Sequence, residues 1–488
     1  MSRINTNVSA LLAQRNLAKS NSDLQLRLER LSTGLQINRG ADNPAGLIVS
    51  ERLRSEIGGI TQSIDNAERA SNVIATSEAA LQEISTLLTS IKGLAIQAAN
   101  TGAFSKEEIE ANQLQIDSAV ESITRISNTA SFAGLKLLNG SLDFITSGVN
   151  STQIQDVRVF GANFGTASTI PVNVEVLNSA ERGLLFLSTY SAASTSGQLL
   201  SSVTFEVQGV KGTHVFAFVS GTSLSAVAFA VNQVSDSTGV SASLVSATNQ
   251  TSGLVLQSAS YGSSAFVSVR KIDKGAFFNT YASKGAASSI NRDAGEDVLA
   301  LVNGNLALGD GTKVGLNSAV LNVQLNLTTT AATALGTYSF SITGGGARYQ
   351  IGAAVNSQQQ VGFGIQSVAA AHLGNETAGF LNSVTSGGAN SLVAGSAREA
   401  SDIIDASITQ IAVLRGRLGA FERNTLQTTI RSQQIALENL TSSESQIRDT
   451  DFASETAMLT RAQILTQAGT SVLATANSSA QNVLRLLQ

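Results

Sequence analysis

The sequence of 488 residues has no cysteine or tryptophan and only two each of proline, methionine and histidine. Without cysteine the chain can form no disulfide, thiolate zinc site or iron–sulfur cluster. Charged residues make up 14% and the net charge is −4. Because no basic stripe is available to displace counterions, the composition argues against a nucleic-acid partner. Aromatics are 5%, so burial has to come from aliphatic side chains.

Targeting and membrane-spanning patterns are also missing. Residues 1–17 contain no central apolar run followed by small residues, so they do not predict a cleaved secretory signal. No stretch approaches the ~18 consecutive apolar residues of a membrane span, and we expect no membrane association. If the chain is secreted, it has to use another route.

The residue types that perform chemistry are sparse. His214 and His372 are far apart, and neither lies in a metalloprotease motif. The sequence contains no P-loop and no nucleophile elbow. Gly362 and Gly364 form half of a dinucleotide fingerprint without its strand–helix context and are better explained by packing. The sequence therefore predicts no enzyme, and no catalytic, cofactor or metal site.

Helical periodicity fills the N-terminal part of the chain. A heptad seam with alternating spacings of four and three positions consists of Leu17, Asn21, Leu24, Leu28, Leu31 and Leu35. After a break at residues 40–44, where Gly40 and Pro44 predict a bend, the seam resumes and continues to residue 98; its first members are Leu53, Ile57, Ile60 and Ile64. A helix of this length spans roughly 70–80 Å. Ser105 and Glu108 predict a capping box for the next helix.

The C-terminal part mirrors this pattern. Ser396 and Glu399 predict a second capping box, and helical periodicity follows to about residue 448. The seam of the last helix consists of Leu459, Ala462, Thr466, Gly469, Leu473, Ala476, Ala480, Val483 and Leu487. Its small residues let another helix approach closely. That partner is either a helix of the same chain or a second copy; self-association is favoured, because one chain offers this apolar helix little partner surface.

The middle of the chain, about 145–395, is rich in Gly, Ser, Thr and Val and reads as β-structure. Alternation predicts a hairpin from residues 203–207 and 215–219, a helix at 224–234 capped by Ser223, and strands near 241–247, 254–257 and 266–272. A second hairpin-then-helix unit is predicted from strands at 338–342 and 349–353 and a helix at 358–371. All five tyrosines lie between Tyr190 and Tyr349, in this region.

Several motifs at the two ends closely resemble those of bacterial flagellins. They are LSTGLQIN at 31–38, INRGADNPAGLIVSERL at 37–53, LAIQAAN at 94–100, FAGLKLLNG at 132–140, IRDTDFASE at 447–455, RAQILTQAGTSVLATAN at 461–477 and QNVLRLLQ at 481–488. The resemblance covers about 140 residues at the front and about 90 at the back. It does not extend strongly into the middle, whose hairpin-helix units look somewhat like small insertion modules of some flagellins.

The resemblance implies an α+β fold in which a long antiparallel helical coiled coil from both ends carries inserted β-rich outer domains. Residues 1–45 and 449–488 would form the filament core, 46–145 and 396–448 a helical shell with a β-hairpin, and 146–395 as many as two surface domains. The core interface would use Leu24, Leu28, Leu31, Leu35, Leu459, Ala462, Gly469, Leu473, Ala476, Ala480, Val483 and Leu487. The shell interface would use Leu53, Ile57, Ile60, Ile64, Leu94, Gln97 and Asn100.

The resemblance also implies a homopolymer, extracellular in the filament, whose subunits leave the cell unfolded through the flagellar type III apparatus. Its expected partners are an export chaperone, a filament cap protein and hook–filament junction proteins. Recognition by the vertebrate innate flagellin receptor is weakened as an expectation, because Ser90, Gly93 and Gln115 stand where many recognised flagellins carry Arg or acidic residues.

Three other hypotheses remain. A hook–filament junction protein would share the N-terminal pattern but diverge at the C-terminus, where this chain matches. A secreted enzyme on the same frame would need a metal or catalytic motif in the middle. An adhesin or receptor ligand displayed by the middle could coexist with a filament role, and the Ser/Thr-rich composition there fits O-linked sugars and a plain soluble surface equally well.

Overall fold

The computed structural model describes residues 6–188, 197–246, 253–273, 278–283, 288–318 and 320–485. The chain divides into two compact units. Unit 1 consists of Met1–Ser71, Gln350–Val355 and Phe421–Gln488, and unit 2 consists of Asn72–Tyr349 and Asn356–Ala420. Helices at both ends and sheets in the middle confirm the α+β prediction.

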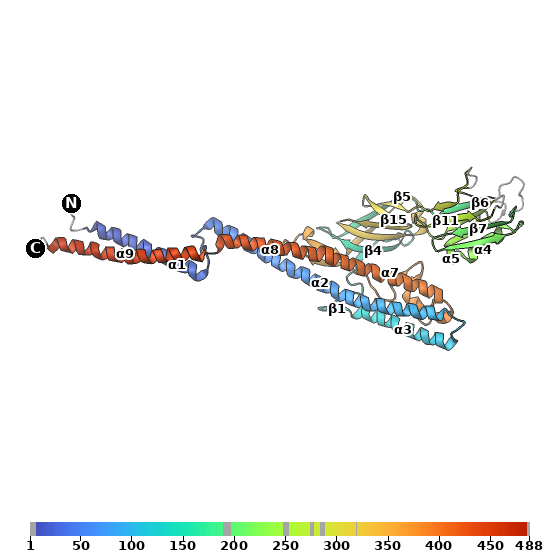
Figure 1. Cartoon of the computed structure of the whole chain (residues 1–488), viewed down its shortest axis with the longest axis horizontal. Helices are drawn as coiled ribbons and strands as arrows, with labels where there is room; N and C mark the ends of the chain where they lie inside the picture. The colour runs from blue at the N-terminus through green and yellow to red at the C-terminus, as the bar shows by residue number, and fades with distance from the viewer. Residues whose placement is uncertain are drawn as a thin grey trace. The chain divides into compact units, whose positions relative to one another are not determined.

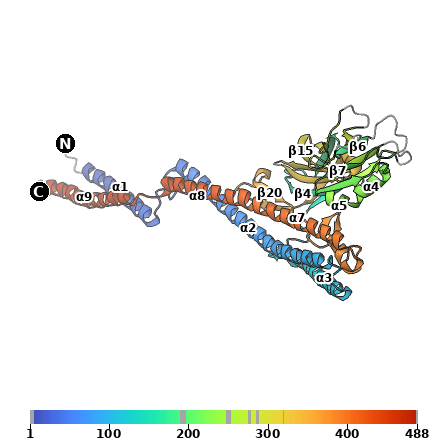
Figure 2. The ribbon, with the colours of Figure 1, turned by 45° about the vertical axis from the view of Figure 1, so that its right-hand side comes forward.

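Unit 1 is helical. It contains α1 (Val8–Thr33), the first part of α2 (Pro44–Ala98), the π-helical turn η5 (Glu422–Leu426), α8 (Gln427–Arg448) and α9 (Phe452–Arg485). Helices α1 and α9, from opposite ends of the chain, lie side by side (Figures 1 and 2). The side chain of Asn7 caps α1 by accepting the Ala10 N–H at 3.0 Å.

The connection between α1 and α2 is fixed by backbone bonds to the α8–α9 connection. Thr450 N–H donates to the Gly34 carbonyl at 2.9 Å, and Gln36 N–H donates to the Arg448 carbonyl at 2.7 Å. Gly34 ends α1 with φ of +74°, which favours glycine. Pro44 occupies the first position of α2, where its missing N–H costs nothing. At Gly40 an added Cβ would meet only a Leu47 methyl at 3.7 Å, so that glycine is not required for space.

The helical part of unit 2 combines the rest of α2 with α3 (Lys106–Thr129), the hairpin β1 (Ser131–Phe132) and β2 (Leu135–Lys136), and α7 (Ala397–Phe421). Its aliphatic core includes the fully buried Leu81, Ile84, Leu88, Ile116 and Ile123. The predicted capping box of Ser105 and Glu108 is confirmed. The one predicted for α7 is not formed in this described stretch, where the Ser396 hydroxyl bonds to the Ala389 carbonyl instead.

The larger sheet of unit 2 encloses one hydrophobic core. Its antiparallel strands are β3 (Phe144–Ser147), β4 (Ile154–Ala162), β5 (Ile170–Asn178), β14 (Leu299–Val302), β15 (Asn305–Asp310), β16 (Lys313–Asn317), β17 (Leu321–Leu327) and β18 (Gly336–Gly345), in the order β3-β18-β5-β14-β15-β16-β17-β4. The short helix α6 (Thr329–Ala332) closes the core, to which Val174, Ala300 and Leu325 contribute.

A second β-module with its own core is inserted between β5 and β14. It contains β6 (Leu184–Ser188), β7 (Val203–Gln208), β8 (Thr213–Phe218), α4 (Leu224–Gln233), α5 (Ser235–Thr238), β9 (Val240–Leu244), β10 (Leu254–Ser258), β11 (Phe266–Lys271), β12 (Asn279–Tyr281) and β13 (Arg292–Ala294). The strands form two sheets, β12-β6-β10-β9 and β13-β11-β7-β8. The predicted hairpin of β7 and β8 is confirmed, as is the Ser223 cap of α4.

The second predicted hairpin-then-helix unit is wrong. Strand β18 pairs with β3 and β5, while β19 (Ala347–Gln350) pairs with β20 (Gln360–Phe363), and no helix covers 358–371 in this described stretch. Gly364 N–H donates to the Phe160 carbonyl and Ile365 N–H to the Leu142 carbonyl, so the segment bonds to its neighbours rather than to itself. The remaining short elements are η2 (Ser357–Gln359), β21 (Gly374–Asn375), β22 (Gly379–Phe380), η3 (Leu381–Val384) and η4 (Leu392–Ala394).

The two glycines of the half fingerprint have a packing role, as predicted. A Cβ at Gly362 would lie 2.5 Å from the Ala162 carbonyl oxygen, and one at Gly364 would lie 2.6 Å from the Val159 carbonyl oxygen. Only glycine lets this segment approach β4 so closely.

Candidate assembly surfaces

The predicted core seam of α9 faces α1 of the same chain. On α9, Ala462 is buried, and the other described seam members are half-buried, namely Leu459, Thr466, Gly469, Leu473 and Ala476. On α1, Leu24 and Leu31 are half-buried, Leu28 is 50% exposed, and Leu35 follows the helix half-buried. Ala480 and Val483 lie in α9, but their side chains are outside the described residues, and Leu487 is outside them altogether. The sequence analysis favoured a second copy as the partner of this seam, but the described part of the seam packs against α1 of the same chain.

Close approach and two polar contacts fix the register of α1 against α9. A Cβ on Gly469 would lie 3.2 Å from a Leu17 methyl, tighter than an ordinary contact. Arg27 donates to both carboxylate oxygens of Glu455 at 3.2 Å, and Glu455 is buried. The Asn7 amide donates to the Ala476 carbonyl at 3.0 Å. The buried carboxylate of Glu455 needs a cationic partner, so the Arg27–Glu455 pair also fixes the register of the two helices.

Apolar side chains also lie on the outward faces of the α1–α9 pair. They are Val8, Leu11 and Leu12 on α1, and Ile464, Leu465 and Val472 on α9, all of them between 47% and 64% exposed. Exposed apolar groups gathered on a helix pair usually mark an interface with another molecule. On the sequence, Val8 and Leu11 belong to a short apolar stripe at 3-4 spacing, whereas Leu12, Ile464, Leu465 and Val472 lie outside the seams. We define these six residues as the outer face of the helix pair.

The predicted shell residues of α2 in unit 1 face α8 and the neighbouring segment. Ile60 and Ile64 are buried, whereas Leu53 and Ile57 are half-buried. Along this helix three serine hydroxyls meet polar side chains of the C-terminal half: Ser50 with Glu444 at 3.1 Å, Ser63 with Gln433 at 3.0 Å and Ser71 with Glu422 at 2.8 Å. These polar pairs fix the register, since a shift would leave the buried hydroxyls of Ser50 and Ser63 unsatisfied.

The predicted shell residues of unit 2 are more exposed than those of unit 1. Leu94 is half-buried, and Gln97 and Asn100 are exposed near the end of α2. The three departures Ser90, Gly93 and Gln115 are exposed as well, so whatever contacts this surface meets them directly. Exposed apolar residues accompany them, with Ile96 at 59% and Leu114 at 68%.

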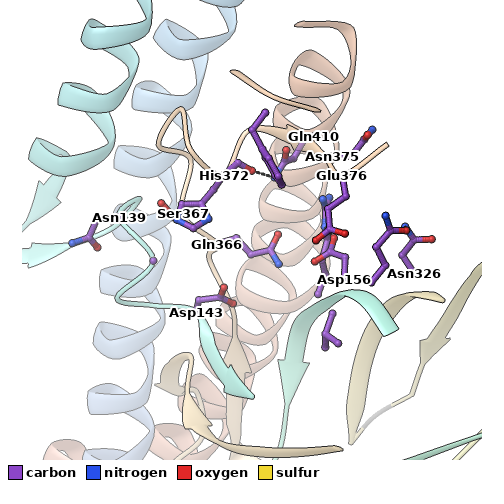
Figure 3. Close-up of a pocket in the computed structure, with 15 residues that line it drawn as sticks. Asn139, Asp143, Asp156, Asn326, Gln366, Ser367, His372, Asn375, Glu376 and Gln410 are labelled. Atoms are coloured by element: carbon purple, nitrogen blue, oxygen red, sulfur yellow. Dashed lines mark hydrogen bonds and ion pairs between the residues drawn. The ribbon is translucent and has the colours of Figure 1, made fainter. Parts of the chain in front are cut away.

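A polar cavity of about 430 Å³ lies in unit 2 among the 139–143 loop, β4, the 366–376 segment and α7 (Figure 3). Its carboxylates are Asp143, Asp156 and Glu376, and Asp156 pairs with Arg158 at 2.7 Å. Ser367 and His372 also line it, but no hydrogen bond joins either to the other or to Asp143 in this described region, so there is no nucleophile–base pair. Nor does any described group of three His, Cys, Asp or Glu side chains suit a metal ion.

Burial raises the pKa of Asp143 to about 6, and the charge of Asp156 adds to the rise, while the Phe144 N–H and His372 oppose it. The free energy of unfolding is therefore expected to decrease as the pH rises from about 4 to about 6. In this range the Asp143 carboxyl keeps its proton in the folded chain but loses it in the unfolded chain. The shift corresponds to about 3 kcal/mol, and partial exposure reduces the expected loss to about 1–2 kcal/mol.

Asp143→Asn should remove this contribution. Urea unfolding at pH 4 and pH 6.5 should show a smaller loss of unfolding free energy for the variant than for the native chain, by about 1–2 kcal/mol. Asp310→Asn removes an exposed carboxyl at the end of β15 in the larger sheet. It serves as the control and should follow the native chain. Parallel pH profiles for native chain and Asp143→Asn would contradict the burial argument.

None of the helices in the described ranges combines the length and apolar character needed to cross a membrane.

Comparisons with known proteins agree on one family. The family model of the bacterial flagellin N-terminal helical region matches residues 4–143, that of the C-terminal helical region matches 401–487, and that of the flagellin hook IN motif matches 202–260. Flagellin B of Helicobacter pylori strain J99 is 30% identical, with 100% of this chain and 99% of the relative aligned. The B-type flagellin of Pseudomonas aeruginosa is 31% identical, with 99% of each covered.

Among solved structures, the flagellar cap protein FliD of Escherichia coli is similar over 47% of this chain and 64% of that chain, with 20% identity and a TM-score of 0.31. A score this low carries no argument about partners. The matches over the full length of flagellins, at 30% identity or above, together with the helical ends and β-rich middle, are decisive. The chain therefore belongs to the bacterial flagellins, the structural subunits of the extracellular flagellar filament.

Proposed function

We propose that copies of this chain build the filament core through the outer face of the α1–α9 pair, while the inward seam holds the two ends of each chain together. The observation that carries the proposal is the set of outward apolar residues, with Leu11 58% and Ile464 63% exposed. Covering such residues in a polymer gains roughly 25 cal/mol per Å² of apolar surface. The shell residues Leu94, Gln97 and Asn100 would add contacts between neighbouring subunits.

We further propose the assembly route that the family suggests. The chain would be exported unfolded through the flagellar type III apparatus, guarded by a chaperone that covers the apolar residues of α9, and would polymerise beneath a cap protein on top of junction proteins. The absence of cysteine supports this, because no disulfide has to be reduced before export. Ser90, Gly93 and Gln115, all exposed, would weaken recognition by a host flagellin receptor.

Seeded polymerisation tests the core proposal and separates it from the junction-protein alternative. Purified full-length chain is mixed with short filament fragments and observed by electron microscopy and sedimentation. We expect filaments that lengthen in proportion to added chain. Leu11→Ser with Ile464→Ser should raise the residual soluble concentration at least tenfold, whereas Val320→Ser, at an exposed valine of the β16–β17 connection, should have less than a threefold effect. A junction protein would instead stop at a complex of fixed size.

A further inference from the structure

The polar cavity of unit 2 has the size of a small-molecule site. Its volume of about 430 Å³ falls within the range of roughly 300–1,000 Å³ that such sites occupy. Its lining comes from distant parts of the chain, since Asp143 precedes β3, Asp156 lies on β4 and Glu376 follows β21. Gln366 and Asp143 approach the space from one side, and Asp156 and Glu376 from the other (Figure 3). The cavity is therefore built by the tertiary fold and not by one surface loop.

Carboxylate oxygens are the first kind of unused group in the lining. Asp143 Oδ1 accepts the Phe144 N–H at 2.8 Å, and its Oδ2 has no donor within the described residues. Asp156 Oδ2 accepts from Arg158 Nε at 2.7 Å, and its Oδ1 is likewise unused in this part of the structure. The exposed carboxylate of Glu376 has no hydrogen bond to any described residue. All three carboxylates can thus accept hydrogen bonds from a ligand.

Amide groups of the same lining supply donors. The oxygens of Asn139 and Asn375 accept backbone N–H groups of their own turns at 3.1 Å and 3.0 Å. Their NH₂ groups have no acceptor among the described residues, so both remain available to a ligand. Gln366 adds a donor and an acceptor, since neither end of its amide is hydrogen-bonded in the described stretches. The cavity therefore suits a ligand whose groups both donate and accept.

Hydroxyl groups meet this requirement. A hydroxyl donates and accepts, whereas an ammonium ion only donates and an ionised phosphate or carboxylate only accepts. Charge also disfavours an anion, because three carboxylates face Arg158, whose charge Asp156 already balances. A metal ion is not favoured either, since no described group of three His, Cys, Asp or Glu side chains suits one. Phe380, half-buried in the lining, adds an apolar surface against which the C–H groups of a sugar ring can pack.

We propose that this cavity binds a neutral saccharide of one or two rings, whose hydroxyls donate to the carboxylates and accept from the amides. Hydrogen bonds to ionised groups are the strong ones, so Asp143, Asp156 and Glu376 supply most of the affinity. This binding is separate from the structural role of the chain, because the lining residues belong to unit 2 and the α1–α9 pair belongs to unit 1. In a filament every subunit repeats the site, so a polymer that carries the sugar can bind several sites at once.

Equilibrium dialysis of the soluble full-length chain tests the site with defined probes. The probes are radiolabelled D-glucose, D-galactose, D-mannose, N-acetyl-D-glucosamine, maltose and lactose. We expect at least one of them to bind saturably, with about one molecule per chain. A disaccharide that binds more tightly than its two component sugars identifies the end of a glycan chain as the ligand, and equal binding identifies the free sugar.

Three variants locate the bound sugar. Glu376→Gln should weaken binding at least tenfold, because it removes a hydrogen bond to an ionised acceptor. Gln366→Leu keeps the size of the side chain but removes the amide, and it should weaken binding as well. Glu121→Gln, the same substitution at an exposed glutamate of α3 outside the cavity, should bind as the native chain does. Thermal unfolding of each variant checks that the fold is unchanged.

Three results would overturn the inference. They are the lack of saturable binding by all six sugars, equal affinity of the native chain and both cavity variants, and saturable binding of 1,4-diaminobutane in place of the sugars. The last result would mean that the cavity acts through its negative charge alone. Because the assay uses soluble chain, its outcome is independent of whether filaments form, which sedimentation measures separately.

Discussion

Removal of residues 459–488 is expected to abolish filament formation while both sheet cores of unit 2 stay folded. The deletion takes away Ala462 and Leu473, which cover α1, and also Ile464, Leu465 and Val472 of the outer face. Burying one leucine-sized side chain is worth about 1.5–3 kcal/mol. The loss of several such residues raises the critical concentration by a factor of about a thousand or more, since each 1.4 kcal/mol is tenfold.

The measurement is seeded assembly of the truncated chain, followed by sedimentation and electron microscopy, with thermal unfolding of the sheets recorded by circular dichroism. No residue of α9 belongs to either described sheet core, so the unfolding transition of the sheets should be unchanged. Normal filaments from the truncated chain would contradict the role given to α9.

Deletion of the inserted module supplies a matched control of larger size. Glu181 and Glu296 form an antiparallel bridge, with Glu181 N–H donating to the Glu296 carbonyl at 2.9 Å, so a short linker can replace residues 182–295. This variant keeps α1, α9 and the larger sheet, and it should polymerise. The contrast shows that loss of assembly follows from which residues are removed and not from how many.

Spacing in the sequence was sufficient to predict which side of α9 meets α1. The alternation of three and four positions selects Leu459, Ala462 and Gly469, and the structure turns these towards the partner helix. A period of 3.5 residues determines a helix face and hence its partner surface. The same spacing does not select the opposite face of α9, which is why the outward Ile464 and Leu465 were missed.

Tertiary contacts explain why the helix predicted at 358–371 is wrong. The apolar spacing at 358–371 suits a helix, but Gly364 and Ile365 donate their N–H groups to β4 and to the 139–143 loop, contacts that bridge about 200 residues of chain. Likewise, Ile351 accepts a hydrogen bond from Gln433 at 2.6 Å, and sequence spacing contains no information on such a distant partner. Propensity is a weak prior where such contacts are available.

The exposed leucines of the larger sheet show a further limit. Alternation in β5 and β14 predicts which residues share one face of the sheet, but it does not say which face is covered. Only the register of four strands reveals that Leu177, Leu299 and Leu308 form one surface. The connection between α1 and α2 shows the same kind of limit. The sequence predicted that Gly40 shapes this bend, whereas the backbone requires glycine at Gly34.

Gly469→Leu is expected to raise the critical concentration for assembly at least tenfold. A Cβ at this position already lies 3.2 Å from a Leu17 methyl and 3.7 Å from the Leu17 Cβ, so the branched end of a leucine would force α1 and α9 apart. Overpacking of this kind costs typically 1–3 kcal/mol. Separation of the helices would also lengthen the 3.2 Å contacts between Arg27 and the buried Glu455.

Two variants separate steric cost from the change in helix propensity. Gly469→Ala needs a shift of only a few tenths of an ångström and gains about 1 kcal/mol of helix propensity, so it should assemble as well as the native chain. Gly58→Leu makes the same substitution in α2 where nothing lies within 4 Å, and it should have little effect. Sedimentation after seeded growth gives the critical concentration of each. If Gly469→Leu matched Gly58→Leu, close approach at Gly469 would play no part in assembly, and the seam would tolerate a wider spacing between its helices.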